Sequence, residues 1–266
     1  MAGSATTVTC DAKATYEAMA SVYDLFTAHY DDELWIGELV SVLERNGLRG
    51  ERLLDVACGT GKSFLSMLDR GWEVTACDIS PAMLARARAK VGEAVPLSVA
   101  DMRDLPEIGK FDLVWALDDS INYLLSEDEL LKALSGMRAN LAPRGLLLFD
   151  VNTLVAYRSF FAETVVVERA GRRLIWRGQT ASDAKPGSIC EAVLEEDGGP
   201  TKTHEHRQRH FADAEIRSAV KRAGLSLVDA YGLYTDGILR QPLDERAHTK
   251  AVYIARSSKP IPTLLR

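Results

Sequence analysis

The middle of the chain alternates short apolar runs with segments of helical periodicity. The apolar runs have the length and composition of buried strands and cover residues 52–57, 73–78, 96–101, 111–117 and 145–152. Apolar residues recur at helical spacing over residues 61–70, 80–91 and 126–141. Gly71 is typical of a helix end, and Ser80-Pro81 is typical of a helix start. This alternation predicts an α/β fold in which a parallel sheet has helices on both faces.

The pattern changes on both sides of this middle part. Before it, helical spacing predicts one helix over 12–29 and another over 33–47. After it, turn residues such as Ala170-Gly171 and Asp197-Gly198-Gly199-Pro200 separate strand-like segments, which indicates an antiparallel unit. These segments cover residues 164–170, 172–180, 189–196 and 202–211. A helix over 213–223 and strands near 225–231 and 250–256 are expected to return to the main sheet.

We therefore predict a Rossmann-like sheet with helices on both faces and a small antiparallel β cap. The predicted division is 1–48 as an N-terminal helical segment, 49–160 as the core, 161–211 as the cap, 212–257 as the return to the core sheet, and 258–266 as a loose tail. Residues 1–10 also have the composition of a loose end.

Composition narrows the choice of partners. The net charge of −6 disfavours nucleic acid, and the basic stretches 172–177 and 206–210 are short enough to be solvated strand faces. The four cysteines show no C-x-x-C spacing, which disfavours a disulfide framework or a zinc site. No run of 18 apolar residues and no basic-then-apolar leader occurs, so we expect a cytoplasmic protein without membrane contact.

The segment LLDVACGTGKS, residues 53–63, joins the first core strand to a helix and is typical of a ligand-binding turn. A phosphate-binding P-loop requires a glycine where Val56 stands. A dinucleotide-binding loop requires a third glycine where Phe64 stands, which disfavours NAD and a nucleotide-dependent oxidoreductase. S-adenosylmethionine fits better, because Asp55 can serve its ammonium group. The small residues Ala57, Gly59 and Gly61 let the backbone approach the ligand closely.

Acidic residues also end the next two strands. Asp78 lies 19 residues after Gly59, at the distance expected for an acid that binds a ribose, and Ile79 offers adenine an apolar surface. Asp101 and Met102 follow the third strand and offer the adenine amino group a carboxylate and an apolar wall. Acids at three successive strand ends favour S-adenosylmethionine more specifically than the glycine loop does.

The motifs DVACGTG, CDIS, VADMRDLP and FDLVWALDDSINYLL resemble the cofactor-binding motifs of class I S-adenosylmethionine-dependent methyltransferases. The Y-x-x-x-A-x-x-Y-D segment from Tyr16 and the H-R-x-x-x-F end of the cap resemble the small-molecule branch, which includes sugar-amine N,N-dimethyltransferases and glycine N-methyltransferase-like enzymes. The resemblance implies a seven-stranded sheet with a reversed last strand, with S-adenosylhomocysteine as product. It also implies that the N-terminal segment is a lid and that the cap covers the substrate site.

The candidate substrate-binding residues are expected above the carboxyl ends of the strands. Asp118 and Asp119 can hold an amine or take a proton, unless one of them only caps the following helix. Asn122 and Tyr123 follow, and sugar-amine relatives tend to carry histidine where Tyr123 stands, which weakens any transfer of their substrate or base. Leu117, just before them, is a candidate cofactor contact.

The cap and the N-terminal segment supply the other candidates. His204, His206 and His210 share one face of a strand, but no further ligand is evident, so no metal is expected and surface positions are the default for such histidines. The resemblance implies a place for His206 over the substrate pocket, and Arg209 can meet an acidic group of the substrate. It also implies that Tyr16, Tyr23 and Trp35 contact the cofactor, with Tyr23 near the sulfonium. The candidate catalytic residues are His206, Asp119 and Tyr23.

The resulting hypothesis is methyl transfer to a nitrogen or oxygen of a small polar metabolite, with secondary metabolism suggested by the resemblance alone. Two alternatives stay open: methylation of a macromolecule, and a non-methylating reaction with the same cofactor. The acidic charge argues against RNA, and no N/D-P-P-Y motif occurs at residues 118–121. The expected oligomeric state is a monomer or a homodimer.

Overall fold

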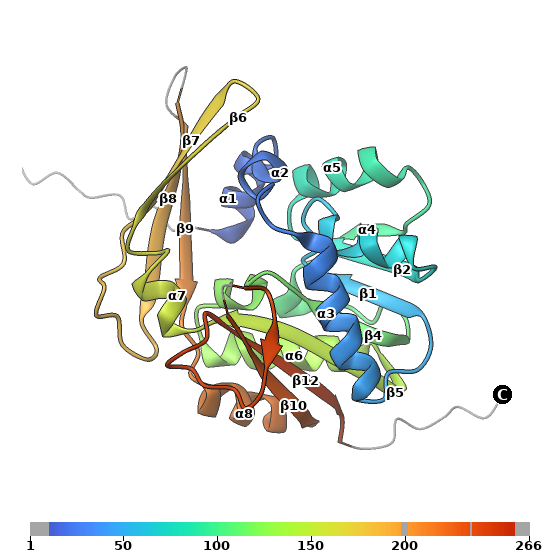
Figure 1. The fold of residues 1–266 in the computed structure, drawn as a ribbon. Helices are drawn as coiled ribbons and strands as arrows, with labels where there is room; N and C mark the ends of the chain where they lie inside the picture. The colour runs from blue at the N-terminus through green and yellow to red at the C-terminus, as the bar shows by residue number, and fades with distance from the viewer. Residues whose placement is uncertain (1–10, 198–201, 235, 259–266) are drawn as a thin grey trace, which may run out of the picture.

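A twisted eight-stranded sheet forms the centre of the protein (Figure 1). The computed structural model describes residues 11–197, 202–234 and 236–258. The sheet order is β11-β10-β12-β5-β4-β1-β2-β3. Its strands are β1 Arg52–Val56, β2 Glu73–Asp78, β3 Leu97–Val99, β4 Phe111–Ala116, β5 Leu141–Asn152, β10 Leu225–Leu233, β11 Leu239–Arg240 and β12 Lys250–Ser257.

Strand direction follows the expected class I pattern. Strands β3, β2, β1, β4 and β5 are parallel neighbours, whereas β12 runs antiparallel to both β5 and β10. The reversed strand β12 confirms the expected topology, and the short edge strand β11 adds an eighth strand to the expected seven. The parallel strands therefore end along one edge, where the loops carrying Asp78, Asp101 and Asp118 gather.

Helices cover both faces of this sheet, as the alternating pattern predicts (Figure 1). On one face, buried residues of α3 Asp32–Arg45, α4 Lys62–Asp69 and α5 Pro81–Val91 pack against the strands. On the other face, α6 Glu127–Ala139 and α8 Asp213–Arg222 bury their apolar sides. No helix of the described residues is long and apolar enough to cross a membrane.

The cap is a separate antiparallel sheet in the order β6-β7-β8-β9. Its strands are β6 Thr164–Arg169, β7 Arg172–Gly178, β8 Ile189–Asp197 and β9 Lys202–Arg209. Figure 1 shows this sheet standing beside the N-terminal helices α1 Ala12–Met19 and α2 Tyr23–Phe26, above the short helix α7 Leu154–Arg158. One apolar cluster joins the inner face of the cap to these three helices.

Several local predictions need correction. The helix predicted over 12–29 is interrupted after Met19 and resumes only at Tyr23, although both pieces bury apolar residues. His204, His206 and His210 are not on the surface: they are 2%, 4% and 2% exposed. The ring of His206 lies against Tyr16 of α1, His204 pairs with Glu196, and His210 packs against Tyr157 of α7. The sequence pattern also missed β11, α7 and two 3₁₀ turns, Met102–Asp104 and Ser120–Tyr123.

Some expectations lie outside the described residues. These are the loose ends at 1–10 and 259–266, Cys10, and the turn at 198–200. The three cysteines that the structure describes, Cys58, Cys77 and Cys190, are buried and unpaired. The division of the chain into domains stays a prediction.

Candidate active site

The loop between β1 and α4 turns sharply through backbone conformations that favour small residues. Ala57, Gly59 and Gly61 have φ angles of 61°, 54° and 85°, in the left-handed region. Asp55 precedes this turn at the end of β1, where it is 1% exposed and accepts a hydrogen bond from Ser63 Oγ at 2.6 Å. Burial raises the pKa of Asp55 to about 7. Asp55 therefore stabilises the loop from below and does not line the cavity.

Phe64 explains why Gly61 cannot carry a side chain. A Cβ atom on Gly61 would lie 2.5 Å from Cζ of Phe64, whose ring is fully buried beneath the loop. Gly59 differs, because a Cβ there would meet only Tyr23 Cε1 at 3.9 Å. The large residue at position 64 thus fills the place where a dinucleotide-binding loop needs glycine.

We expect Gly61→Ala to lower the free energy of unfolding by about 2–4 kcal/mol, since it combines backbone strain with a clash in a packed core. Gly71→Ala is the matched control, because Gly71 has the same φ of 85° but no atom within 4 Å of its Cβ position. Its expected loss is about 1 kcal/mol. Urea unfolding of both variants checks this, and equal losses would contradict the role of the Phe64 contact.

Asp78 connects the glycine loop to the start of α5. Its carboxylate accepts hydrogen bonds from the backbone N–H groups of Gly59 and Ser80, both at 2.8 Å. Burial raises the pKa of Asp78, and these hydrogen bonds oppose that effect. Because Asp78 is 6% exposed and still lines the cavity, its carboxylate is placed both to hold the loop and to meet a ligand.

A cavity above the carboxyl ends of the strands brings together most of the predicted cofactor residues. Those lining it are Tyr16, Tyr23, Ala57, Gly59, Asp78, Ile79, Asp101, Met102 and Leu117. Two predicted substrate residues, Asp118 and Tyr123, also line it. Further lining residues that sequence reasoning missed include Thr60, Lys62, Ser63, Arg103, Ser120, Leu124 and Glu129.

Other predicted site residues do not line this cavity. They are Trp35, Asp55, Gly61, Asp119, Asn122, His206 and Arg209. Trp35 packs against the apolar cluster under α3 and does not line the cavity, which corrects its expected contact with the cofactor. Arg209 pairs with Glu215 at 2.7 Å and stacks over Phe211, so it is not placed to meet a substrate.

Asn122 also has a structural role instead of the expected contact with substrate. It is fully buried, and its amide donates to the backbone oxygen of Arg209 at 2.9 Å. Its Oδ1 accepts from the backbone N–H of Asn152 at 2.9 Å. These bonds join the turn after β4 to β5 and to the end of β9, which fixes the neighbouring Asp118 and Asp119 in place.

The N-terminal helices are held over the cavity by polar contacts. Glu17 of α1 accepts hydrogen bonds from Ser80 Oγ at 2.7 Å and from the backbone N–H of Ala82 at 3.1 Å. Asp24 of α2 pairs with Lys90 of α5 at 2.8 Å and also accepts from Thr60 in the glycine loop. The N-terminal segment is thereby tied to the same loop and helix that Asp78 connects.

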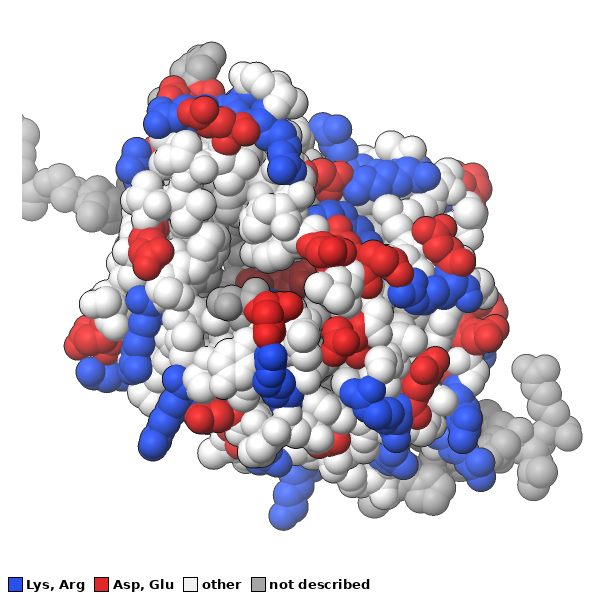
Figure 2. Space-filling view, in the orientation of Figure 1, with Lys and Arg blue, Asp and Glu red and all other residues white. Residues whose placement is uncertain are grey.

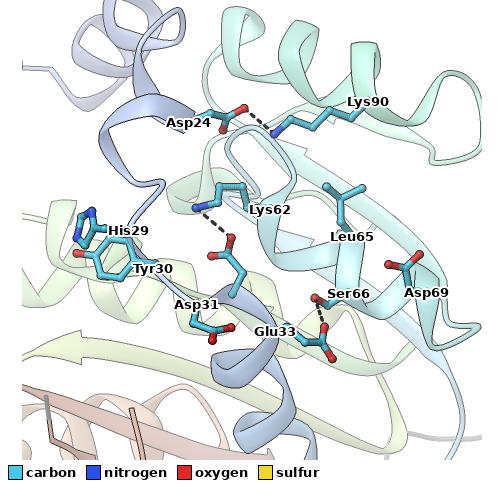
Figure 3. A pocket seen from close by; sticks show the side chains of 11 residues that line it. Asp24, His29, Tyr30, Asp31, Glu33, Lys62, Leu65, Ser66, Asp69 and Lys90 are labelled. Atoms are coloured by element: carbon cyan, nitrogen blue, oxygen red, sulfur yellow. Dashed lines mark hydrogen bonds and ion pairs between the residues drawn. The ribbon is translucent and has the colours of Figure 1, made fainter. Parts of the chain in front are cut away.

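An open groove lies on the surface between α2, α3 and α4 (Figure 3). In Figure 3, Lys90 reaches Asp24 on one side of the groove, and Ser66 reaches Glu33 on the other. Lys62 pairs with Asp32 at 3.0 Å and donates to the backbone oxygen of Thr27 at 3.0 Å. Lys62 thereby anchors the connection between α2 and α3.

A cluster of three carboxylates and one ammonium group lies where β4, β5 and β12 meet. Lys250 Nζ is 2.9 Å from Asp119 Oδ1 and 2.7 Å from Asp150 Oδ2. Asp118, beside them, lines the cavity and is exposed. Burial raises the pKa of Asp118 to about 7; Lys250 opposes this shift, whereas Asp150 and Asp119 add to it.

Figure 2 shows acidic side chains gathered at a hollow between the cap and the main sheet. Among the described residues, no group of three His, Cys, Asp or Glu side chains is arranged to hold a metal ion.

Aromatic rings form the boundary between the N-terminal helices and the cap. The rings of Tyr16 and Tyr123 are 5.2 Å apart in an edge-to-face arrangement. The hydroxyl of Tyr123 lies 2.7 Å from Nδ1 of His206, whose ring is 5.0 Å from Trp176. Burial, with a smaller effect of His204, lowers the pKa of His206 to about 3. His206 is thus a neutral, buried neighbour of Tyr123, which is a poor setting for a base.

Lys250 and Asp150 are the most important residues that sequence reasoning missed. Asp150 stands near the end of a predicted strand, a position shared by the acids that were recognised, so this signal was available. Lys250 gave no signal, because nothing in the sequence around it indicates that its strand lies beside β5.

The Rossmann-like order, the reversed strand β12 and the acids at the strand ends together define the class I methyltransferase fold. The family described as "Methyltransferase domain" matches residues 53–145. The chain is 31% identical over 199 residues to a dTDP-3-amino-3,6-dideoxy-alpha-D-glucopyranose N,N-dimethyltransferase of Streptomyces fradiae, covering 71% of this chain and 76% of that protein. This chain belongs to the S-adenosylmethionine-dependent methyltransferases, and S-adenosylmethionine is its cofactor.

Two further similarities extend over more of the chain. It is 29% identical over 227 residues to the candidate methyltransferase YqeM of Bacillus subtilis (strain 168), covering 83% of this chain and 90% of that protein. The solved structure of the sugar N-methyltransferase KedS8 from Streptoalloteichus sp ATCC 53650 matches with a TM-score of 0.69 and 26% identity, covering 97% of this chain and 99% of that one. The similarity thus includes the N-terminal segment and the cap as well as the core.

Proposed function

We propose that this enzyme transfers the methyl group of S-adenosylmethionine to the nitrogen of a small polar amine. The observation that carries this proposal is the cluster of Asp118, Asp119 and Asp150 at the carboxyl ends of the sheet, which outnumbers its single cation, Lys250. A protonated amine is attracted to such a site, whereas a neutral hydroxyl group gains much less from it.

The residues that line the cavity fit the cofactor. Asp78 is placed for the ribose hydroxyls, and the open space at Gly59 lets the ligand approach the backbone. Ile79 and Met102 offer adenine apolar contacts, and Asp101 offers its amino group a carboxylate. Tyr16 and Tyr23 close the cavity from the N-terminal side, where aromatic rings suit a sulfonium cation.

The chemistry that S-adenosylmethionine supplies is an activated methyl group on sulfur, so the protein has to align the acceptor and manage one proton. We propose that the Asp118 carboxylate receives the proton of the ammonium group. With S-adenosylmethionine bound, the neutral amine would be the nucleophile for its methyl group, and S-adenosylhomocysteine would be the product. A pKa of about 7 makes Asp118 a better base than an ordinary aspartate, while it stays largely ionised above neutral pH.

Asp119 and His206 receive other roles in this proposal. Both oxygens of Asp119 are engaged, one by Lys250 at 2.9 Å and one by Gln208 at 2.6 Å, so it holds the turn in place. His206 orients Tyr123, whose hydroxyl is 2.7 Å away. We propose Tyr123 as the residue that contacts the acceptor in place of the histidine of sugar-amine relatives.

The similarities support a small acceptor and a nitrogen atom. The names of the Streptomyces fradiae relative and of KedS8 each specify methylation of nitrogen, on an amino sugar or a sugar. By analogy, a role in secondary metabolism and a small-molecule partner are proposed for this chain. The absence of a nucleic-acid partner, and a state of monomer or homodimer, stay predictions.

We expect the enzyme to methylate small amines and to leave the matched compounds that carry a hydroxyl group unmethylated. The measurement follows release of S-adenosylhomocysteine and mass gain of the acceptor, with amino sugars and amino acids compared pairwise with analogues that carry hydroxyl in place of the amine. Methylation of the hydroxyl compounds alone would contradict the proposal. Consumption of the cofactor without a methylated product would support the non-methylating alternative, and methylation of protein or RNA but of no amine would support the macromolecular one.

A further inference from the structure

Lys250 is a half-buried cation in the acidic cluster, and the proposed chemistry does not use it directly. It comes from the first residue of β12, and its side chain is 19% exposed. Burial lowers its pKa, but Asp119 and Asp150 outweigh this effect and raise the pKa above its usual value. Lys250 therefore keeps its positive charge at physiological pH.

The contacts of Lys250 engage two of the three carboxylates. Asp150 is fully buried, and its Oδ2 accepts from Lys250 Nζ at 2.7 Å and from the backbone N–H of Asp119 at 3.1 Å. Asp119 accepts from Lys250 through Oδ1 and from Gln208 through Oδ2. Gln208 is itself fixed, since its Oε1 accepts from the Tyr157 hydroxyl at 3.0 Å. Asp119 thus cannot rotate toward the cavity without losing two charge-assisted contacts.

Asp118 differs from its neighbour in this respect. Its carboxylate accepts no hydrogen bond from the described residues, and it lines the cofactor cavity. Asp118 and Asp119 have φ angles of 54° and 55°, so two successive left-handed residues direct adjacent side chains differently. The charged and titratable groups that act on Asp118 are Lys250, Asp150, Asp119, Asp32, Asp55, Tyr23 and Tyr30.

We propose that Lys250 is a positioning residue: it binds Asp119 and Asp150 together, and so leaves Asp118 as the carboxylate available to cationic ligands in the cavity. Without Lys250, the carboxylates of Asp119 and of the fully buried Asp150 would lie beside Asp118 without a neutralising cation, and their repulsion would raise the pKa of Asp118. The inference rests on the proposed function in one respect, namely that this cluster faces the site of methyl transfer.

The cofactor and its product provide a probe that needs no acceptor. S-adenosylmethionine carries a permanent positive charge on sulfur, and S-adenosylhomocysteine does not, while their other ionisable groups are the same. The ratio of their dissociation constants therefore reports the charge of the cavity. In the wild type, we expect binding of S-adenosylmethionine relative to S-adenosylhomocysteine to strengthen as pH rises, with a midpoint at about 7 where Asp118 ionises. The expected change is on the order of tenfold.

Two substitutions are expected to move this midpoint in opposite directions. Lys250→Met removes the cation that lowers the pKa of Asp118, so the midpoint should rise by roughly one to three pH units. Asp150→Asn removes a carboxylate that raises this pKa and frees Lys250 to act on the others, so the midpoint should fall. Calorimetric titration of both ligands from about pH 5 to about pH 9 measures these shifts.

Lys250→Arg is the conservative control, because it retains the charge and should keep the midpoint near that of the wild type. An unchanged midpoint in folded Lys250→Met, or shifts of both variants in the same direction, would overturn the proposal. If Lys250→Met does not fold, the nearly isosteric Asp150→Asn decides the question, and the absence of a downward shift overturns it. Opposite shifts in an enzyme that methylates no amine would leave this inference standing and reject only the proposed acceptor.

Discussion

Replacing Asp78 by alanine is expected to weaken binding of both S-adenosylmethionine and S-adenosylhomocysteine by about 30-fold or more. The wild-type carboxylate accepts from the N–H groups of Gly59 and Ser80, each at 2.8 Å. Alanine leaves these donors without their partner and removes the acid proposed to bind the ribose. The two losses act on one ligand, so their combined effect should exceed that of a single surface hydrogen bond.

Calorimetric titration of both ligands into the variant checks this expectation. Asp183→Ala is the matched control, because Asp183 is an exposed acid of the cap whose only ion pair is with Lys185 at 3.3 Å, among the residues described. This control should bind both ligands as the wild type does. Equal affinities of Asp78→Ala and the wild type would show that the cofactor lies elsewhere, and unfolding of Asp78→Ala must be excluded by circular dichroism.

Asp118→Asn is expected to reduce turnover of an amine acceptor by about 100-fold or more, while binding of S-adenosylhomocysteine stays within about threefold of the wild type. The amide is nearly isosteric, but it neither takes a proton nor attracts a cation. In the wild type, the raised pKa of about 7 means that the carboxylate is protonated, and inactive as a base, at lower pH. The rate should therefore rise with pH through about 7, and the variant should lack this rise.

His206→Gln separates this assignment from the alternative in which histidine is the base. His206 is 4% exposed, does not line the cavity, and has a pKa lowered to about 3 by burial. Its replacement should cost less than about tenfold, through the orientation of Tyr123, and should leave the pH dependence of the rate in place. The reverse result, a large loss in His206→Gln and wild-type turnover in Asp118→Asn, would assign proton transfer to the histidine.

The sequence brought together residues that line one cavity wherever local geometry decides their place. Asp78 and Asp101 were found because parallel strands end at one edge of the sheet, so an acid after each strand falls near the same ligand. Small residues at Ala57, Gly59 and Gly61 indicated a tight turn, and all three have positive φ angles. These features depend on a few consecutive residues and on the rule that neighbouring parallel strands place their carboxyl ends along one edge of the sheet.

The prediction was weaker wherever a side chain could satisfy its polar atoms within the protein. Asn122 and Arg209 had suitable chemistry for a substrate. In the structure, however, the amide of Asn122 is hydrogen-bonded to backbone groups, and the guanidinium of Arg209 pairs with Glu215. His206 was expected over the substrate site, whereas its ring is buried behind Tyr123. Residue type indicates which interactions a side chain can make, but tertiary packing decides which partner the side chain actually binds.

The sequence by itself determined the alternation of the main strands and helices, the tight turn after the first core strand and the acids at the strand ends, because periodicity and turn chemistry act over short segments. Only the tertiary structure decided which acid is free. The antiparallel register of β12 on β5 places Lys250 opposite Asn152 and brings it within 2.7 Å of Asp150. That contact joins residues 100 positions apart. Charge neutralisation requires atoms within a few ångströms of each other, and nothing along the chain specifies that distance before the strands pair.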